Sequence, residues 1–299
     1  MHMNLFSEIC TILDEAAVEH TTGAVSGCKA IFVGSAAVIP AIISAQNLKD
    51  AADEASRHKV AVGQLLEQRG IYPLTIAEDR WRLQKDMMTS RLLAHVHIFN
   101  QLYARNCEVR KIDKRTAADF LEKNHSYGDA KCRYRYGLYL KRHTGHNADK
   151  AQEGLNPGVI EPGTLVAVAT FSNARKWVKG EKIIRSYEWT RYASLPGVRL
   201  SGGMGKLLKS FIKDVKPDDI MTYADLEWSE GDVYKALGFV LEGQKDPVDF
   251  IIDSNWKRTA LPESTNSGNE ASDQASKSAA LYFRNMGSNK YRLKLTDYQ

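Results

Sequence analysis

The sequence predicts a mixed α/β fold, with a sheet flanked by helices from about residue 103 onward and a mainly helical region over residues 1–102. Three observations predict this. The uninterrupted apolar run Leu165–Phe171 is typical of a strand buried on both faces. Apolar residues over Met204–Val215 recur at steps of three and one, which indicates an amphipathic helix. Several other strand-like segments after residue 103 are followed by single helices, as in an α/β domain.

Composition places the chain among ordinary globular proteins. The 299 residues fit about two domains, and the 43% hydrophobic content excludes full-length disorder. The net charge of +5 permits an anionic partner without requiring one. Four widely spaced cysteines predict reduced thiols in a cytoplasmic protein, not a disulfide framework or a zinc site. The most apolar stretch, Ala30–Ile43, is too short and too interrupted to span a bilayer, so no membrane partner is expected.

Two helices are expected in the first hundred residues. Leu48–Arg69 is rich in Ala, Glu, Lys and Gln, and Gly70 follows as a helix end. Thr75–Ile98 carries apolar residues that partly follow a spacing of three and four, which predicts a second helix. Ile31–Ile43 fits a buried strand or a buried helix equally well. None of these segments shows a recognisable set of catalytic residues.

The remaining elements follow from alternation, breakers and caps. Strands are expected at Cys107–Ile112, Arg133–Lys141, Ser186–Ala193, Ile220–Ala224, Phe239–Leu241 and Val248–Ile252. Helices are expected at Thr116–Asn124 and after Ser229, which would cap a short helix that ends at Gly238. Leu281–Phe283 and Tyr291–Leu295 would form a final hairpin. Residues 263–280 contain five serines and no aromatic residue, which predicts a flexible loop.

A glycine-rich turn between a strand and the clearest helix is the strongest chemical feature. Unpaired amides at a helix start, together with the helix dipole, bind phosphate. The residues of this candidate phosphate site are Arg199, Ser201, Gly202, Gly203, Met204, Gly205 and Lys206. The turn is not a P-loop, because Leu207 follows Lys206 where that motif has Ser or Thr. Alternatively, the glycines only shape a tight turn into the helix.

A second feature places acidic residues at the end of a strand. Asp225 and Glu227 follow the strand Ile220–Ala224, and Tyr234 lies on the next helix. Ligands of open α/β sheets bind at the carboxyl ends of their strands. The alternative is that the two acids are solvated and that Tyr234 belongs to the core.

From residue 103 onward, the order of elements resembles the GNAT acyltransferase superfamily. The resemblance rests on the strand, the glycine-rich turn that begins near Gly202, and Tyr234 shortly before Gly238 and Phe239. It implies a GNAT-like mixed sheet, a donor that is acetyl-coenzyme A or another acyl-coenzyme A, and transfer of the acyl group to an amine. In this family the glycine-rich turn grips the pyrophosphate of the donor.

Within this superfamily, the sequence more closely resembles a divergent branch that is similar to phage Mom-type DNA-modification proteins. The residues that carry this likeness are Asn124-His125, Arg191-Tyr192, Gly202-Gly203, Tyr223-Ala224-Asp225, Trp228-Ser229 and Tyr234. This branch implies modification of adenine in a nucleic acid, with a donor that need not be acyl-coenzyme A. A third alternative is a GNAT-like protein that binds nucleic acid without catalysis.

Acyl transfer would divide the catalytic roles among three residues. Glu188 is the candidate base for the amine proton. Tyr234 is placed to protonate the leaving thiolate, and Asp225 would orient the amine or replace Glu188 as the base. In a regular strand Glu188 and Arg191 point to opposite faces, so both can serve only if the strand is bulged. Glu188 could instead be a surface partner of a neighbouring cation.

Cations interleaved with aromatic residues indicate a nucleic-acid interface as the alternative to a small amine substrate. They occur over Lys131–Tyr136 and again at Asn173, Arg175, Lys176 and Trp177. The candidate substrate-binding residues are His125, Tyr127, Arg133, Arg135, Arg191 and Trp228. No His pair has the supporting ligands of a metal site, so no metal is assigned.

Overall fold

The computed structural model describes residues 4–142, 160–262 and 280–298. Nearly all of the loop expected at 263–280 lies outside the described residues. The chain divides into two compact units. Unit 1 comprises residues 1–88, 225–230 and 244–289, and unit 2 comprises residues 89–224, 231–243 and 290–299. The units are thus interleaved along the chain, in contrast to the consecutive segments 1–102 and 103–299 expected from the sequence.

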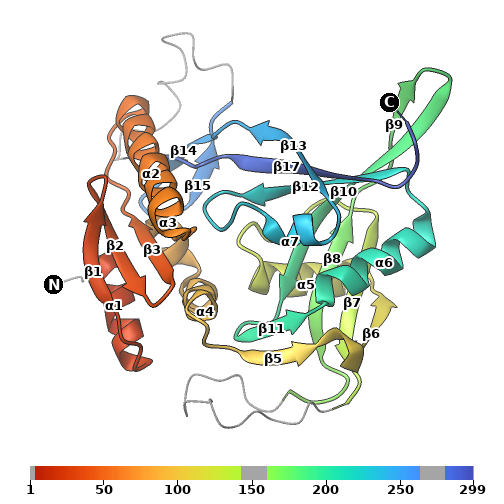
Figure 1. Ribbon diagram of the computed structural model, residues 1–299, viewed down its shortest axis with the longest axis horizontal. Helices are drawn as coiled ribbons and strands as arrows, with labels where there is room; N and C mark the ends of the chain where they lie inside the picture. Colours follow the sequence, from red (N-terminus) through yellow and green to blue (C-terminus); the bar gives the residue numbers. More distant parts are fainter. Residues whose placement is uncertain (1–3, 143–159, 263–279, 299) are drawn as a thin grey trace. The chain divides into compact units, whose positions relative to one another are not determined.

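Unit 1 contains a four-stranded sheet in the order β1-β2-β3-β4 (Figure 1). Its strands are β1 (Thr21–Val25), β2 (Cys28–Val33), β3 (Ala36–Ala41) and β4 (Leu74–Ala77), and only β3 and β4 are parallel. The segment Ile31–Ile43, which the sequence left open, is therefore largely strand. Two helices of this unit are α1 (Leu5–Glu15) and α2 (Leu48–Arg69), and α2 ends at Gly70 with φ of 64° as expected.

The helix expected over Thr75–Ile98 is wrong as a single element. The segment instead forms β4, then α3 (Glu78–Leu83) and α4 (Lys85–His95). All four residues of β4 are buried beside β3. Gln84 leaves helical geometry between the two helices, with φ of −133° and ψ of 42°. Periodicity cannot detect a sheet partner that lies more than thirty residues away, so it overestimated the length of the helix.

Unit 2 is built on an eight-stranded sheet, which confirms the α/β fold class. The order is β13-β17-β12-β10-β8-β7-β6, and β9 pairs with β10 beside this path. The strands are β6 (Cys107–Lys111), β7 (Tyr134–Leu140), β8 (Leu165–Phe171), β9 (Arg175–Lys179), β10 (Lys182–Ser194), β12 (Asp219–Asp225), β13 (Val240–Lys245) and β17 (Ser288–Lys294). A separate parallel pair joins β5 (Asn100–Tyr103) to β11 (Val198–Ser201). The helices are α5 (Lys114–Asn124), α6 (Gly203–Val215) and α7 (Asp232–Ala236).

Aromatic packing fixes α6 on the sheet. Phe211 of α6 stacks on Phe171 of β8 with ring centroids 3.9 Å apart. Tyr134, Tyr136 and Tyr187 meet the same Phe211 ring edge-on. Such offset and edge contacts add to the gain from burying large rings. These contacts hold α6 against β7, β8 and β10.

The last part of the chain corrects two expectations. The strands near Leu281 and Tyr291 form, but they do not pair as a hairpin. β16 (Leu281–Arg284) joins β14 (Asp249–Ile252) and β15 (Arg258–Ala260), whereas β17 lies between β13 and β12. The cap of α7 is Gly231 with φ of 97°, and not Ser229. Local patterns identify strands, but the choice of partner depends on packing between distant segments.

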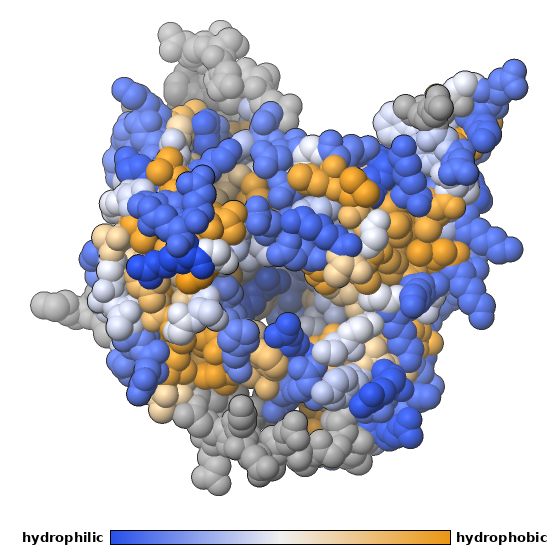
Figure 2. Space-filling view, viewed as in Figure 1, coloured by the Kyte–Doolittle hydropathy of each residue, from blue (hydrophilic) through white to orange (hydrophobic). Residues whose placement is uncertain are grey.

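The basic segment after residue 172 forms the strand β9. β9 pairs antiparallel with the start of β10, with Lys179 opposite Lys182 and Trp177 opposite Ile184. The hairpin bearing β9 is labelled in Figure 1, and mainly hydrophilic residues cover it in Figure 2. Trp177, Val178 and Ile183 are nevertheless exposed in it. No helix in the described part of the chain is long and apolar enough to cross a membrane.

Candidate functional site

The start of α6 presents uncapped amides. Gly202, the N-cap residue, adopts a left-handed conformation with φ of 75° and offers no side-chain acceptor. The first amide groups of a helix have no partner within the helix, and they carry its positive partial charge. A Cβ on Gly203 would lie 2.6 Å from Leu200 Cδ2, so no larger residue fits there without a shift. This local geometry is suited to an anion.

An open groove of about 610 Å³ runs over this helix start. It is lined by Gly202, Gly205, Lys206, Lys209, Ser210, Lys213, Ala236 and Leu237. The glycine-rich turn is therefore not sealed beneath neighbouring side chains. Lys209 and Lys213 are exposed and follow Lys206 along one side of α6. The sequence analysis did not include these two lysines in the candidate phosphate site.

Three of the predicted anion-binding residues have other partners. Lys206 Nζ donates to Ala104 O at 2.8 Å and to Cys107 O at 2.6 Å. The Arg199 guanidinium lies 5.2 Å from the centre of the Phe99 ring. Ser201 Oγ accepts a hydrogen bond from Gln101 at 2.7 Å. Lys206 still lines the groove, whereas Arg199, Ser201 and the partly buried Met204 do not. The helix start and the next two lysines thus hold the exposed positive character.

The parallel strands β10 and β12 are paired over a short stretch. Their parallel pairing covers Ser186–Glu188 against Asp219–Met221 and no further. Beyond it, the Thr222 hydroxyl donates to Trp189 O at 3.1 Å. β10 then continues beside β8, with a register shift between Trp189 and Arg191. Parting strands free backbone groups on their facing edges, and such groups are available to a bound ligand.

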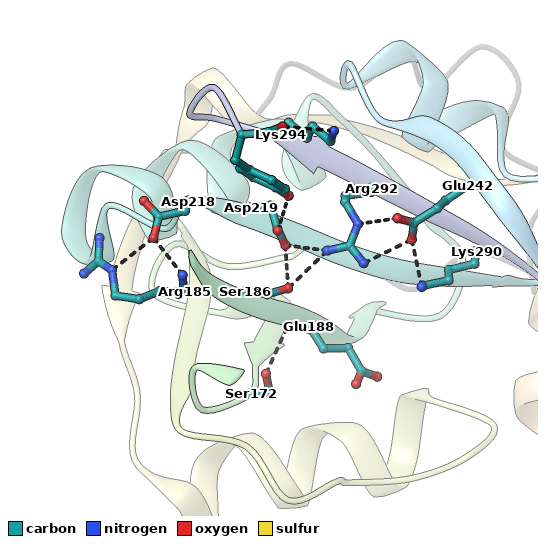
Figure 3. A network of polar contacts seen from close by, with 11 residues as sticks. Ser172, Arg185, Ser186, Glu188, Asp218, Asp219, Glu242, Lys290, Arg292 and Lys294 are labelled. Atoms are coloured by element: carbon teal, nitrogen blue, oxygen red, sulfur yellow. Dashed lines mark hydrogen bonds and ion pairs between the residues drawn. The ribbon is translucent and has the colours of Figure 1, made fainter. Parts of the chain in front are cut away.

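A polar network joins the same two strands before they part (Figure 3). Arg292 Nη1 donates to Asp219 Oδ1 at 2.7 Å and to Ser186 Oγ at 3.2 Å. Glu242 accepts two hydrogen bonds from Arg292, which hold the pKa of its carboxyl down at about 2. Because Arg292 lies on β17, three neighbouring strands are tied together at this end. The separation of β10 from β12 is therefore confined to the residues that follow Glu188.

Glu188 sits at the end of the paired segment. Its backbone N–H donates to Ser172 Oγ at 2.9 Å, and its carboxylate lies apart from the network in Figure 3. Burial lowers the pKa of Arg191, and the charge of Glu188 opposes that shift. Glu188 and Arg191 can act on the same side of β10 only if the strand is bulged, and a register shift is present between Trp189 and Arg191.

Tyr234 is partly buried and packs against the core cluster of unit 2. Its ring packs edge-on to Trp189 with centroids 6.1 Å apart, and it also contacts Phe239 and Tyr291. Burial raises the pKa of its hydroxyl, and a hydrogen bond with Thr222 opposes the shift. A neutral phenol at physiological pH can donate a proton. Thr222, which sequence reasoning missed, carries no local signal because it is one residue of a buried strand.

Three of the predicted substrate-binding residues, His125, Tyr127 and Arg191, lie close to one another. Tyr127 N–H donates to His125 Nδ1 at 3.1 Å, and the Tyr127 ring lies 5.9 Å from the Arg191 guanidinium. Arg191 Nε donates to Gly128 O at 3.1 Å. Arg135 instead donates to Cys132 O at 2.8 Å, and Arg133 is exposed at the start of β7.

The predicted residues Asp225 and Trp228 belong to unit 1, whereas Glu188 and Tyr234 belong to unit 2. Trp228 Nε1 donates to Asp225 Oδ2 at 3.1 Å. Arg80 Nη2 lies 3.9 Å from the same carboxylate, and its guanidinium lies 5.7 Å from the Trp228 ring centre. Arg80 was not predicted, because its helix was read only as an amphipathic element. The described residues contain no group of three or more His, Cys, Asp or Glu side chains that could hold a metal ion.

No protein-family model and no curated protein sequence matches the chain. Among solved structures, the chain is similar to Eis1 from Mycobacterium abscessus, with 14% identity and a TM-score of 0.33 over 48% of this chain and 33% of that chain. It is also similar to a GNAT-family acetyltransferase from Bacillus anthracis, with 15% identity and a TM-score of 0.30 over 63% of this chain and 95% of that chain. The match thus spans about a third of the length of the Mycobacterium structure.

Proposed function

We propose that unit 2 is a GNAT-like transferase that moves an acyl group from an acyl-coenzyme A to an amine. The observation that carries this proposal is the uncapped start of α6, which opens on a lysine-bearing groove and lies close to β10, where the Tyr192 hydroxyl is 3.1 Å from the Cβ position of Gly203. A diphosphate fits such a site because it accepts several amide hydrogen bonds and carries negative charge. Donors that lack a phosphate would leave these amides unpaired.

The chain's own residues divide the remaining work. Gly202 and Gly205, which line the groove at the start of α6, would present backbone amides to the diphosphate, and Lys209 and Lys213 would neutralise it. The thioester of the donor would supply the activated acyl group. Glu188 accepts the amine proton, and the Tyr234 hydroxyl holds the proton that the departing thiolate takes. Ala236 of α7 and the following Leu237 line the groove, so the helix that carries Tyr234 flanks the proposed donor site.

Calorimetric titration with acetyl-coenzyme A tests this proposal. The variant Lys209→Glu/Lys213→Glu replaces two exposed cations at the groove, and we expect it to weaken binding at least about tenfold by electrostatic repulsion. Lys123→Glu on α5 removes an exposed lysine outside the groove and serves as the matched control. Absence of saturable binding by the unaltered protein at millimolar donor would exclude an acyl-coenzyme A transferase.

We propose modification of a nucleic-acid base as the second candidate function, because positive charge is concentrated in one unit. Unit 2 holds 28 of the 41 Lys and Arg residues but only 16 of the 36 Asp and Glu residues, a formal net charge of +12. Such a charge favours a polyanionic partner. Arg175, Lys176 and the exposed Trp177 extend it along the β9 hairpin, and two-stranded ribbons fit the major groove of DNA.

Duplex binding measured over a range of salt concentrations separates the two candidates. We expect affinity to fall steeply with salt, and Arg175→Glu/Lys176→Glu to reduce the logarithmic slope by about two. Glu181→Gln at the hairpin tip should bind at least as well as the unaltered protein, because it removes a negative charge. Salt-independent binding would leave the small amine as the acceptor class.

A further inference from the structure

Unit 1 contains a narrow pocket with a buried carboxylate. Residues lining it include Glu54, His58, Thr75, Glu227, Phe283 and Met286. Its volume is about 20 Å³, which is room for one water-sized group. Every lining residue belongs to unit 1, so the pocket is separate from the groove at α6.

Glu227 is the unusual member of this pocket. It is 1% exposed, and neither of its carboxylate oxygens has a hydrogen-bond partner among the described residues. Arg80 Nε lies 3.9 Å from Oε2, beyond hydrogen-bond distance. A buried carboxylate that accepts no hydrogen bond is costly, and such groups are normally paired. The pocket beside it is the place where a donor group could enter.

The surrounding charges favour a cationic donor. Asp79 is engaged by Arg258, whose Nη2 donates to Oδ1 at 2.6 Å. Arg80 lies 3.9 Å from both Asp225 and Glu227. These two arginines therefore face three carboxylates, and Arg284, the arginine that lines the pocket, is paired with Asp249. The whole of unit 1 carries a formal net charge of −7, with 13 Lys and Arg against 20 Asp and Glu residues.

The other residues that line the pocket restrict the size and polarity of the cation that can bind. Ala41, Ala51 and Met286 are buried and apolar, and Phe283 adds an aromatic ring. Burial lowers the pKa of His58 to about 4, so its imidazole adds no positive charge at neutral pH. A volume of this size, lined by a carboxylate and apolar residues, suits the –NH₃⁺ head of an alkylamine. A quaternary ammonium head is too large for this volume.

We propose that this pocket binds the primary ammonium group of an alkylamine, with Glu227 as the hydrogen-bond acceptor. The site is independent of the transferase proposed for unit 2, since it uses none of the same residues. The ammonium group would supply up to three donors to a carboxylate that has none. The ammonium head alone fills this volume, so its alkyl chain would extend out of the pocket past the exposed Ile42.

Calorimetric titration with n-butylammonium chloride at pH 8.5 tests this on the full chain. We expect saturable binding that Glu227→Gln weakens at least about tenfold, because the charge of the acceptor is lost. Glu67→Gln, an exposed acid on the same helix as His58 but outside the pocket, should bind like the unaltered protein. Tetramethylammonium and n-butanol should bind at least about tenfold more weakly, for reasons of size and charge respectively.

A second variant tests the proposal independently, in case Glu227→Gln does not fold. Ala55→Leu keeps the carboxylate and fills the pocket from α2, so it should also abolish binding of n-butylammonium. Circular dichroism checks that each variant is folded. The proposal is overturned if the unaltered protein shows no saturable binding up to high millimolar ligand, if a folded Glu227→Gln or Ala55→Leu variant binds normally, or if tetramethylammonium binds equally well.

Discussion

Arg292 donates a hydrogen bond of 2.7 Å to Asp219, and this ion pair ties β17 to β12 where β12 runs parallel to β10. Asp219 is 2% exposed, and Ser186 of β10 and Tyr298 also hydrogen-bond to it. The pair stands just before the strands part beyond Glu188. It therefore holds closed the end of the sheet opposite the proposed donor site.

Removing one partner of this pair should destabilise the fold. We expect Arg292→Ala to lower the free energy of unfolding by about 3 kcal/mol, because Asp219 would remain buried and charged. Urea denaturation measures this directly. Arg115→Ala breaks the exposed pair with Asp119, whose side chains are 90% and 68% exposed, and should cost less than about 0.5 kcal/mol. Equal effects of the two variants would contradict the structural role of Arg292.

Glu8 should make stability depend on pH in the acid range. Burial raises its pKa, but hydrogen bonds from Trp81, Arg82 and Lys85 outweigh this and bring the pKa down to about 2. The folded pKa lies below the unfolded value near 4.5, so the stabilisation is complete above pH 4.5 and is lost as the pH falls towards 2. The shift corresponds to about 3 kcal/mol.

Urea melts from pH 5 to pH 2 check this prediction. The unaltered protein should lose stability steeply through that window, and Glu8→Gln should show a shallower slope. Glu19→Gln removes an exposed carboxyl nearby in the sequence and should leave the slope unchanged.

Tyr234→Phe should separate chemistry from folding. The variant keeps the ring packed against Trp189 and Phe239 but removes the hydroxyl. We expect turnover to fall about a hundredfold, the size of a lost general acid. Release of free coenzyme A thiol, measured over a panel of amines and nucleosides, gives the rate. Tyr103→Phe, an exposed residue on β5, is the control, and equal rates for the two variants would remove Tyr234 from the mechanism.

Gly203→Ala should reveal how tightly the glycine-rich turn is packed. The new Cβ would meet Leu200 Cδ2 at 2.6 Å and the Tyr192 hydroxyl at 3.1 Å. We expect a loss of about 1–3 kcal/mol from overpacking, measured by urea denaturation. Gly243→Ala is the matched control, since nothing lies within 4 Å of its Cβ position. A neutral Gly203→Ala would show that the turn has room to spare.

Sequence patterns predicted much of unit 2, because its strands and helices carry strong local signals. Leu165–Phe171 is a strand over the same residues, and α6 begins one residue before the expected Met204. The glycine-rich turn and Tyr234 were identified as candidate site residues from the same local patterns. Pairing was not predictable: β16 and β17 join different sheets, although they follow one another in the chain.

The candidate sites show the same limit. Lys209 was not among the predicted site residues, yet it lines the groove together with Ala236 and Leu237. Arg80 and Glu227 lie in segments distant in sequence, and only folding brings them to 3.9 Å. A single sequence shows the type of each residue but not which distant residues share a pocket.

The interleaving of the units has a practical consequence for anyone who shortens this chain. The chain passes between the units five times, and Met286 packs in one cluster with Ala30 and Ile39. A fragment that starts at residue 103 would keep Met286 and Leu226 but lose the strands that cover them. Such a fragment would expose apolar surface and aggregate, so each half is best studied by point substitution within the intact polypeptide.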